Sequence, residues 1–323
     1  MNNNNVTVIG SGRWGSFIAW YLSTLGKNVL IYGRGDSERF NALRTQRGNE
    51  HLKYNDTVSF TDDLKKAIEH ADAIYVSISA QAVRDFMRQL ALVGVKKEKI
   101  IVLCMKGLEE RTGERLSTIV SSTLHGHENV AIWVGPGHVQ DFLAGRPNCM
   151  VIDSAKQELV PFLAEDLTSH LIRFYKGDDI IGNEVGAAAK NVIGIAAGAL
   201  DGLGCPALKG ALMARGAREV GRLIAAMGGK EISAYGLAHL GDYEATLFSE
   251  FSHNRKYGRA LAEGKQFDSL AEGRSTSKAL MVLSALYDVD MPICTGVYEV
   301  IYSGADIKTV INDMFLRNIK KEF

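Results

Sequence analysis

The chain has 323 residues, which exceeds the size at which a single hydrophobic core keeps growing, so two domains are expected. Its 37 basic and 37 acidic residues cancel, which removes the usual electrostatic reason for binding nucleic acid or inserting at an anionic membrane. A small-molecule partner is therefore favoured over a nucleic acid or a membrane.

The start of the chain, a histidine pair and the four cysteines indicate the cellular compartment and whether a metal is bound. The start of the chain is polar and shows no basic segment followed by an apolar one, so nothing directs export. His125 and His127 form a pair without a third ligand nearby, so no metal site is expected. Four distant cysteines predict reduced thiols in a cytoplasmic protein: Cys104, Cys149, Cys205 and Cys294.

The first element is a short apolar strand, Val6–Ile9, which leads into a G-x-G-x-x-G turn and then a helical run. Gly10 permits the tight turn, Gly12 lets backbone N–H groups approach phosphates, and Gly15 lets the helix pack close to its strand. A second strand follows. A strand, this turn and a helix in that order predict a Rossmann unit that binds a dinucleotide pyrophosphate.

The second strand ends in a sequence that bears on the choice of nicotinamide cofactor. An NAD-selective site usually has an acid at this point, where it accepts from the ribose 2′-hydroxyl. Here the first charged residue is Arg34, with Asp36 two positions later. Because arginine suits a 2′-phosphate, we expect NADP(H) to be favoured, with NAD(H) the alternative.

Further along, short β-branched runs alternate with amphipathic helical stretches such as Thr61–His70 and Gln81–Leu92, which is typical of βαβ units in a parallel sheet. The fold class is α/β, with a doubly wound sheet. Seven strands are predicted: Val6–Ile9, Val29–Tyr32, Ala73–Ser77, Ile100–Cys104, Val130–Val134, Cys149–Ile152 and Leu171–Phe174.

After residue 179 the pattern changes and becomes helical from Asn183 onward, so we place a domain boundary near residue 180. The first helix beyond it, Glu184–Leu200, is rich in alanine and glycine, which predicts close packing and burial. Lys190 stands in its middle. Burial of this amine lowers its pKa unless a carboxylate holds the charge, and the alternative is a side chain that snorkels to the surface.

Six motifs in this order make the chain resemble the bacterial-type NAD(P)-dependent glycerol-3-phosphate dehydrogenases along nearly its whole length. They are the glycine turn at residues 10–15 and the segments 104–109, 134–136, 189–193, 240–242 and 254–258. The resemblance implies a Rossmann domain at 1–180 and an all-α substrate and catalytic domain of the 6-phosphogluconate dehydrogenase C-terminal type at 181–323. It implies hydride transfer between the nicotinamide and C2 of glycerol 3-phosphate, giving dihydroxyacetone phosphate, for glycerophospholipid precursor synthesis.

The same resemblance implies three catalytic residues. Lys190 matches the family's general acid and base, which suits a ketone reduction that develops alkoxide charge. Asp242 matches the aspartate that orients the amine and binds substrate hydroxyls. Lys106, just beyond a strand, is implied to touch both substrate and cofactor.

The remaining implied contacts are of two kinds. The cofactor contacts are Gly10, Gly12, Arg13, Trp14, Gly15, Arg34, Lys106, Val139, His253 and Glu272, and the substrate contacts are Lys106, Gly135, Gly137, Lys190, Asp242, Ser252, His253 and Asn254. His253 departs from the family pattern because it replaces an arginine that reaches the phosphate. Histidine offers fewer donors and is mostly neutral above pH ~6.5, so weaker phosphate binding is expected. Three nearby cations are candidates for the missing charge: Lys209, Arg255 and Arg274.

Three functions remain open on this sequence. The leading one is the glycerol-3-phosphate dehydrogenase. The second is a dehydrogenase of another small phosphorylated or acidic hydroxy compound, for which His253 and Gly137 are the motive. The third is a dinucleotide-sensing protein without turnover, against which the retained Lys106, Lys190 and Asp242 count. The small residues of the first helix of the second domain allow for a homodimer.

Overall fold

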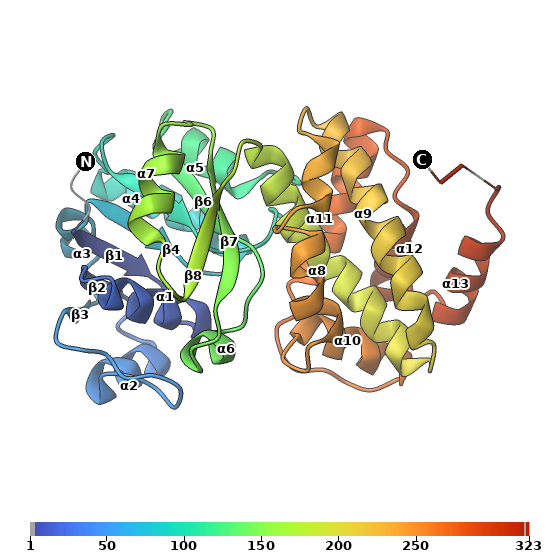
Figure 1. Cartoon of the computed structure of the whole chain (residues 1–323), viewed down its shortest axis with the longest axis horizontal. Coiled ribbons are helices and arrows are strands. Elements are labelled where there is room, and N and C mark those ends of the chain that lie inside the picture. The colour runs from blue at the N-terminus through green and yellow to red at the C-terminus, as the bar shows by residue number, and fades with distance from the viewer. Residues whose placement is uncertain (1–3, 320, 323) are drawn as a thin grey trace. The chain divides into compact units, whose positions relative to one another are not determined.

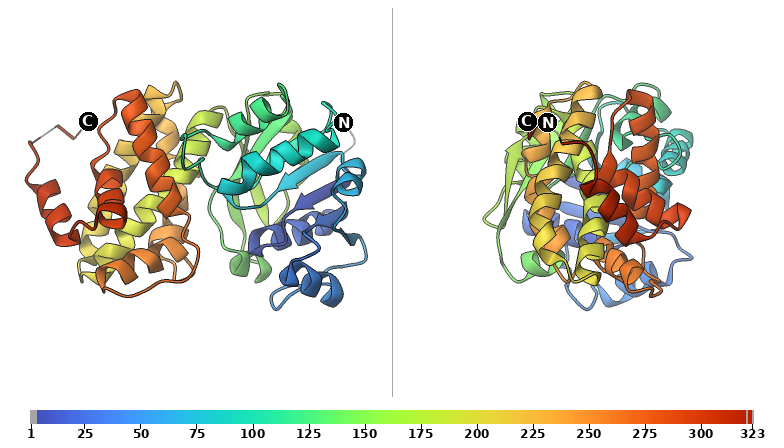
Figure 2. Two further views of the ribbon diagram at one scale, coloured as in Figure 1. Left: turned by 180° about the vertical axis from the view of Figure 1, so that it is seen from behind. Right: turned by 90° about the vertical axis from the view of Figure 1, so that its right-hand side faces the viewer.

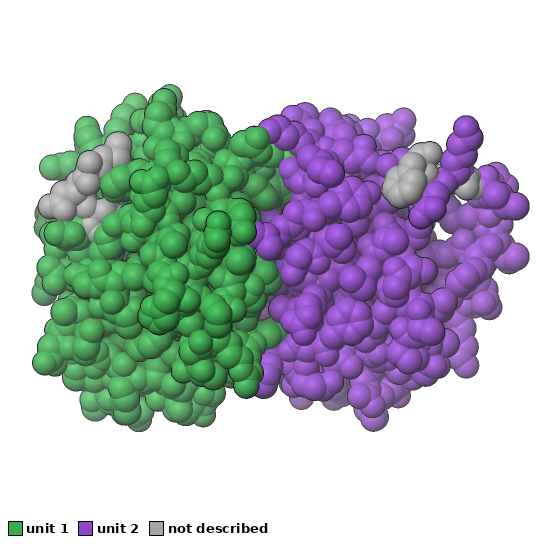
Figure 3. Space-filling model, viewed as in Figure 1, with its two compact units in different colours: residues 1–106, 114–184 green, residues 107–113, 185–323 purple. Residues whose placement is uncertain are grey.

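The computed structural model describes residues 4–319, 321 and 322, and they divide into two compact units (Figure 3). Unit 1 is formed by the residues up to 106 and by residues 114–184. Unit 2 is formed by residues 107–113 and by those from 185 onward. The short segment 107–113 therefore groups with unit 2, which no local sequence pattern indicates, because grouping depends on contacts far along the chain.

Unit 1 is built on an eight-stranded sheet in the order β3-β2-β1-β4-β5-β6-β7-β8 (Figure 1). All neighbouring strands are parallel except β6 and β7, which are antiparallel. The predicted Rossmann-type doubly wound sheet is confirmed. The strands are β1 (Asn5–Ile9), β2 (Asn28–Tyr32), β3 (Val58–Thr61), β4 (Ala73–Val76), β5 (Ile100–Leu103), β6 (Val130–Val134), β7 (Asn148–Ser154) and β8 (Ile172–Lys176).

Helices cover both faces of this sheet, as the front and back views show (Figures 1 and 2). Because both faces are covered, strands such as β4 and β6 are buried along their whole length. The helices of unit 1 are α1 (Arg13–Thr24), α2 (Glu38–Gln46), α3 (Leu64–His70), α4 (Val83–Val93), α5 (Leu116–Thr123), α6 (Val139–Leu143) and α7 (Leu159–Leu167).

The prediction of seven strands is wrong by one, because no strand is predicted where β3 lies. Only Val58 and Thr61 of its four residues are buried, so β3 carries little apolar signal, and its pairing with β2 creates the strand. The predicted helix Thr61–His70 is correspondingly too long. Thr61 ends β3, and Asp63 is the N-cap of α3, accepting a hydrogen bond from the Lys66 N–H at 3.1 Å.

Unit 2 is helical, with two single π-helical turns and several short 3₁₀ segments. Its longest helix, α8 (Ile180–Gly202), begins with residues that belong to unit 1. The others are α9 (Lys209–Ala226), α10 (His253–Ala262), α11 (Gly273–Tyr287), α12 (Pro292–Tyr298) and α13 (Ile307–Phe315), and the π-helical turns are Glu244–Phe248 and Glu299–Ser303. Among the described residues, none of the helices has the length and apolarity that crossing a bilayer requires.

Helix α8 meets α10 with almost no space between the two backbones. A Cβ atom placed on Gly198 would lie 1.9 Å from the Arg255 carbonyl oxygen, and one on Gly258 would lie 1.9 Å from that of Ile195. Only glycine permits this approach. The small residues of α8 are therefore used inside unit 2, and they hold α10 against the helix that carries Lys190.

We predict that Gly198→Ala destabilises the protein by about 1–3 kcal/mol, because the added methyl group forces the α8 and α10 backbones apart. Gly210→Ala is the matched control, since Gly210 is a helical glycine of α9 with nothing within 4 Å of the added Cβ. That change should stabilise by up to about 1 kcal/mol through helix propensity. Chemical denaturation of both variants measures the difference, and equal stabilities would refute the close packing.

Candidate functional site

The glycine turn follows β1 at the point where the strand order reverses, between β1 and β4. Gly10 has φ +106°, and its N–H donates to the Tyr32 carbonyl at 3.1 Å. A Cβ on Gly10 would lie 2.2 Å from the Ser77 carbonyl oxygen, and one on Gly15 would lie 2.2 Å from that of Gly10. The turn, the start of α1 and the end of β4 are therefore in backbone contact.

Gly12 differs from Gly10 and Gly15 because a Cβ atom placed on it would meet nothing within 4 Å. It is the N-cap of α1 and supplies no side-chain cap. The first N–H groups of α1 and the positive end of its dipole thus face a space that a side chain would fill. A pyrophosphate fits this cradle, because a crevice outside the carboxyl ends of the strands, at the switch point, is where open α/β sheets bind nucleotides.

Arg34 lies beyond the carboxyl end of β2, the strand beside β1. Its side chain is 80% exposed, and its Nε lies 3.8 Å from an oxygen of Asp36. Arg13, the first residue of α1, is also exposed. Both guanidinium groups are placed at the same edge of the sheet as the glycine turn, where they can meet phosphate oxygens.

Trp14 is half-buried, and its ring is part of an aromatic cluster on one face of the sheet. It stacks on Phe17 with ring centroids 5.1 Å apart and lies 6.4 Å from the ring of Phe142. Trp133 completes the cluster at 6.3 Å. Packing of α1 and α6 over the sheet accounts for the position of Trp14, so contact with a cofactor stays a prediction.

Lys106 follows β5, the next strand across the sheet from β4. Its Nζ donates to the Gly135 carbonyl at 2.6 Å, which brings together two segments that follow neighbouring strands. Gly137 has φ +136°, and a Cβ there would lie 2.4 Å from the Phe142 ring. Val139 begins α6 and is buried. These residues form one group at the carboxyl edge of the sheet.

In unit 2, Lys190 is buried in the middle of α8, with 7% of its surface exposed. Its Nζ lies 3.1 Å from an oxygen of Asp242, which is 1% exposed, and donates to the Thr246 hydroxyl at 2.7 Å. Of the two sequence-based alternatives, the carboxylate partner is the one found, and the side chain does not snorkel to the surface. A buried ammonium with a carboxylate and a hydroxyl at hydrogen-bonding distance can hold and release a proton.

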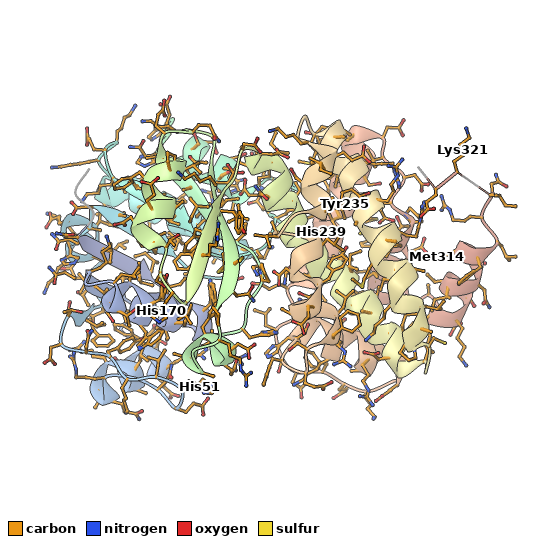
Figure 4. All side chains as sticks on the ribbon, in the orientation of Figure 1. His51, His170, Tyr235, His239, Met314 and Lys321 are labelled. Carbon is orange, nitrogen blue, oxygen red and sulfur yellow. The ribbon has the colours of Figure 1, made fainter. Side chains whose placement is uncertain are left out.

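The segment that carries Asp242 is attached to α8 through His239, which Figure 4 labels. This histidine is fully buried. Nδ1 of His239 is 2.8 Å from the Gly186 carbonyl, one helical turn before Lys190, so this nitrogen carries the proton and donates. Nε2 then accepts from the Tyr243 hydroxyl at 2.7 Å. Burial lowers the pKa of His239 to about 4, and the nearby Lys190 adds to this effect. The imidazole is therefore neutral.

The π-helical turn that carries Thr246 is held by a second ionic group. Lys209 donates to the Leu247 carbonyl at 3.1 Å, and Arg255 donates to the Phe248 carbonyl at 3.1 Å. Both cations contact Asp201 at 2.6 Å. Although burial acts to raise it, the hydrogen bonds from these cations lower the pKa of Asp201. Lys209 and Arg255 are thus engaged in holding this turn.

His253, Ser252 and Asn254 begin α10. Ser252 caps the helix by accepting from the Arg255 N–H at 3.3 Å. The Asn254 amide donates to the Asn191 side chain at 3.0 Å and accepts from the Gly273 N–H at 2.9 Å, which joins α8, α10 and α11. Glu272 is the N-cap residue of α11. Ser252 and Asn254 therefore have structural roles, and their substrate contacts stay predictions.

His253 itself is the first residue of α10, and its Nδ1 lies 3.2 Å from the Leu270 carbonyl. Of the three cations expected to replace its missing charge, two are held by Asp201. The third, Arg274, has its guanidinium 5.9 Å from the ring centroids of both Tyr257 and Tyr302. In their observed positions, Lys209 and Arg255 therefore do not replace the positive charge that is missing at His253.

Sequence reasoning missed Thr246, His239 and Tyr243. Thr246 follows Asp242 by four residues, a spacing that puts both on one side of a helical turn once that turn is known. His239 is three residues before Asp242, but a lone histidine in an apolar stretch gives no indication of its partner. Its bond to Gly186 joins residues 53 positions apart, which only folding reveals.

Unit 1 and unit 2 together have the features of a dinucleotide-binding enzyme whose helical part contains a buried lysine. Two family models match the chain: the N-terminus of NAD-dependent glycerol-3-phosphate dehydrogenase over residues 5–160 and its C-terminus over residues 179–312. The chain belongs to the NAD-dependent glycerol-3-phosphate dehydrogenase family.

Similar proteins match over nearly the full length. A glycerol-3-phosphate dehydrogenase (NAD(P)+) of Clostridium botulinum is 33% identical over 331 residues, with 99% of each chain covered. One from Latilactobacillus sakei is 35% identical over 338 residues, with 98% of each covered. The crystal structure of glycerol-3-phosphate dehydrogenase from Coxiella burnetii matches with a TM-score of 0.89 and 25% identity, covering 98% of this chain and 99% of that one. The resemblance inferred from the motifs is confirmed.

The buried His239 predicts a pH dependence of stability. Its pKa in the folded chain is about 4, against an ordinary value of 6.5, so between these values the unfolded chain binds a proton that the folded site excludes. The free energy of unfolding therefore decreases as the pH falls through this window. From pH ~7 to pH ~5 the loss from this group is about 2 kcal/mol.

Urea denaturation at both pH values measures this loss. His239→Asn is the comparison, because its amide can still donate toward Gly186 but does not titrate. We expect the variant to be less stable at pH ~7 and to show a smaller decrease toward pH ~5 than the parent. Contributions of the carboxyl groups are common to both proteins and cancel. The same decrease in both would show that His239 is not excluded from protonation.

Proposed function

We propose that this chain catalyses reversible hydride transfer between a nicotinamide dinucleotide and C2 of glycerol 3-phosphate, with dihydroxyacetone phosphate as the ketone. Family membership and the relatives named for this activity support the substrate. The observation that carries the mechanism is the buried Lys190 ammonium with Asp242 and Thr246 around its Nζ. In this proposal residues 1–180 bind the dinucleotide and residues 181–323 supply the catalytic groups, and the product serves glycerophospholipid synthesis.

The chemistry at Lys190 follows from charge. When bound, the dinucleotide supplies or accepts the hydride, and the ketone oxygen gains negative charge as its carbon is reduced. An ammonium at that oxygen stabilises the charge and donates the proton, and the neutral amine takes the proton back in the oxidative direction. Asp242 stabilises the charge of the amine and orients it, and the hydrogen bond to the Thr246 hydroxyl fixes the orientation of Nζ further. Lys106, at the sheet edge, adds a positive charge for the substrate phosphate.

We predict that Lys190→Met lowers kcat for dihydroxyacetone phosphate reduction by about three orders of magnitude, because the ammonium group proposed as the proton donor is removed. Binding of NADPH should change less than twofold, since Lys190 lies in unit 2. Lys308→Met, which removes an exposed lysine of α13, is the control and should retain full activity. NADPH oxidation followed at 340 nm and cofactor titration measure the two effects. Normal turnover by Lys190→Met would refute the mechanism.

The dinucleotide cradle consists of Gly10, Gly12 and Gly15, and we propose that Arg34 selects between the two cofactors. The Arg34 side chain, which is 80% exposed and lies just beyond the carboxyl end of β2, can reach a 2′-phosphate. Asp36 is the residue that can accept from a 2′-hydroxyl, so NADH is used as well. Both cofactors occur in the names of the similar enzymes, and the preference for NADP(H) is our proposal.

We predict that Arg34→Ser raises KM for NADPH roughly 10- to 100-fold, because a charge-assisted contact to phosphate is lost. KM for NADH should stay within twofold, since no 2′-phosphate is involved. Arg39→Ser, which removes another exposed arginine on the adjacent α2, is the control. Steady-state kinetics with both cofactors decide the matter. An equal rise in both KM values would show that Arg34 acts on the shared part of the dinucleotide.

A second substrate class is favoured by one observation. His253 stands where the family has an arginine, and neither Lys209 nor Arg255 takes over its charge. A small acidic or differently phosphorylated hydroxy compound with the same reacting centre would need less positive charge there. A panel of phosphorylated and carboxylated ketones, compared by kcat/KM, separates the two classes, and the absence of turnover on all of them would favour dinucleotide sensing.

Compartment and assembly complete the proposal. Free cysteines, of which Cys104 and Cys294 are buried, are compatible with the reducing cytoplasm that we propose. A homodimer stays a prediction, and its original support has weakened because the small residues of α8 contact α10 of the same chain. The expectation that nucleic acid is not a partner also stays a prediction.

A further inference from the structure

Unit 2 contains a cavity of about 600 Å³ that is separate from the residues around Lys190. It lies among α8, α9, α12 and α13, and Met314 and Lys321, labelled in Figure 4, are part of its wall. Small-molecule sites in proteins range from about 300 to 1,000 Å³, so the volume is that of a ligand site. Neither Lys190, Asp242 nor Thr246 lines it.

Much of the cavity wall is apolar. Side chains from each of the surrounding helices line it, among them Ile195 and Leu200 of α8, Leu212 of α9, Val297 of α12, and Val310 and Met314 of α13. None of the residues of α13, all of them described, is buried, although its apolar side chains line this cavity. Its apolar face is thus turned toward a hollow instead of a packed core.

Helix α13 contacts α12 beside the cavity. A Cβ atom on Gly296 of α12 would lie 2.6 Å from both Met314 Cε and Val310 Cγ1, so α13 touches α12 there. The space therefore extends from this contact toward α8 and α9. Its volume of about 600 Å³ is that of a small-molecule site and is too small for a folded partner.

The polarity of the cavity changes along α9. Leu208 and Leu212 line the beginning, whereas Arg215 and Arg222 line the later part. From residue 208 to residue 222 is 14 positions, or about 21 Å at the helical rise. The wall made by α13 and the residues after it changes in the same way, from Val310 to basic residues beyond its end.

The basic ends of the two walls meet. Arg222 donates to the Asp290 carbonyl at 2.7 Å and Arg317 binds the Asp290 carboxylate, while Arg215 donates to the carbonyl of Glu322 at 3.3 Å. The cavity is therefore apolar at one end and cationic at the other.

The acidic residues in the wall cancel this charge only in part. Glu219 is 1% exposed, and its two oxygens accept the N–H groups of Ile293 and Cys294 at the start of α12, each at 2.9 Å. Asp290 is bound by Arg317. A third acidic residue, Glu322, also lines the wall, so the four basic residues Arg215, Arg222, Arg317 and Lys321 exceed the three acidic ones by one charge. This small positive excess is complementary to a single anionic group.

We propose that this cavity binds a single long acyl chain that carries an anionic head group. The chain lies between α13 and the helices α8 and α9, and the head group is at Arg215, Arg222 and Lys321. Half of a bilayer hydrocarbon core, the space of one acyl chain, is about 15 Å thick, so a cavity that runs about 21 Å along α9 holds the chain and its head group. The proposal is independent of the substrate assigned to Lys190.

Titration calorimetry with the full-length protein, at ligand concentrations below micelle formation, tests it. The probes are palmitate, with a carboxylate head, and palmitoyl lysophosphatidate, with a phosphate head, so that the two sources of the anion are compared. Each is expected to bind saturably with one molecule per chain. Monopalmitoylglycerol, which has the same chain and no charge, should bind about tenfold more weakly. Equal affinity for the neutral lipid would overturn the assigned head-group site.

Two tryptophan variants on α9 locate the binding. Ala211 and Ala214 are both exposed alanines of this helix, and only Ala211 lines the cavity. Ala211→Trp should reduce affinity for both anionic probes at least tenfold, while Ala214→Trp leaves it unchanged. Arg215→Gln should weaken the anionic probes about tenfold and the neutral lipid little. Turnover of the ketone substrate without lipid should be unchanged in all three.

The contrary results are clear. Equal binding by the parent protein and Ala211→Trp would place the lipid elsewhere and overturn the proposal. An absence of lipid binding would also overturn it. If sedimentation then showed that Ala211→Trp dissociates a dimer, the cavity would be an interface between two copies of this chain.

Discussion

The structure of unit 2 depends on keeping one ammonium group inside a helical core. Burying the charge of Lys190 without a partner would cost several kcal/mol, and the cost is offset only by close polar contacts. Asp242 and Thr246 provide them at 3.1 and 2.7 Å. Both are on segments that have little regular structure of their own, so they must be held against α8 by other contacts.

Two groups of polar residues hold those segments. His239 bonds the segment before Asp242 to a carbonyl of α8, and Asp201, with two cations, fixes the π-helical turn that carries Thr246. Glycines allow α10 to approach α8 at backbone distance, which brings Arg255 to Asp201. Packing and polar contacts thus both fix the position and orientation of the Lys190 ammonium. In unit 1 the equivalent constraint is steric, since Gly10 and Gly15 leave no room for a side chain at the turn.

Much of this organisation was predictable because it depends on local patterns. The glycine turn, the alternation of strands and helices, and the small residues around Lys190 indicate a Rossmann sheet followed by a helical part. Strand β3 was not predicted because a four-residue edge strand with two buried side chains gives little apolar signal in the sequence. Thr246 and His239 escaped for another reason: their partners are 56 and 53 positions away in the sequence. Local patterns hold no information on such pairs.

The sequence by itself determined the class of protein, the dinucleotide-binding turn and the identity of the buried lysine, because each depends on neighbouring residues and their order. Tertiary structure decided which carboxylate and hydroxyl surround that lysine, and that Lys209 and Arg255 bind Asp201 instead of standing in for the charge missing at His253. It also decided that α13 faces a hollow with one cationic end. These outcomes depend on distances between segments far apart in the chain, which only the packing of helices sets.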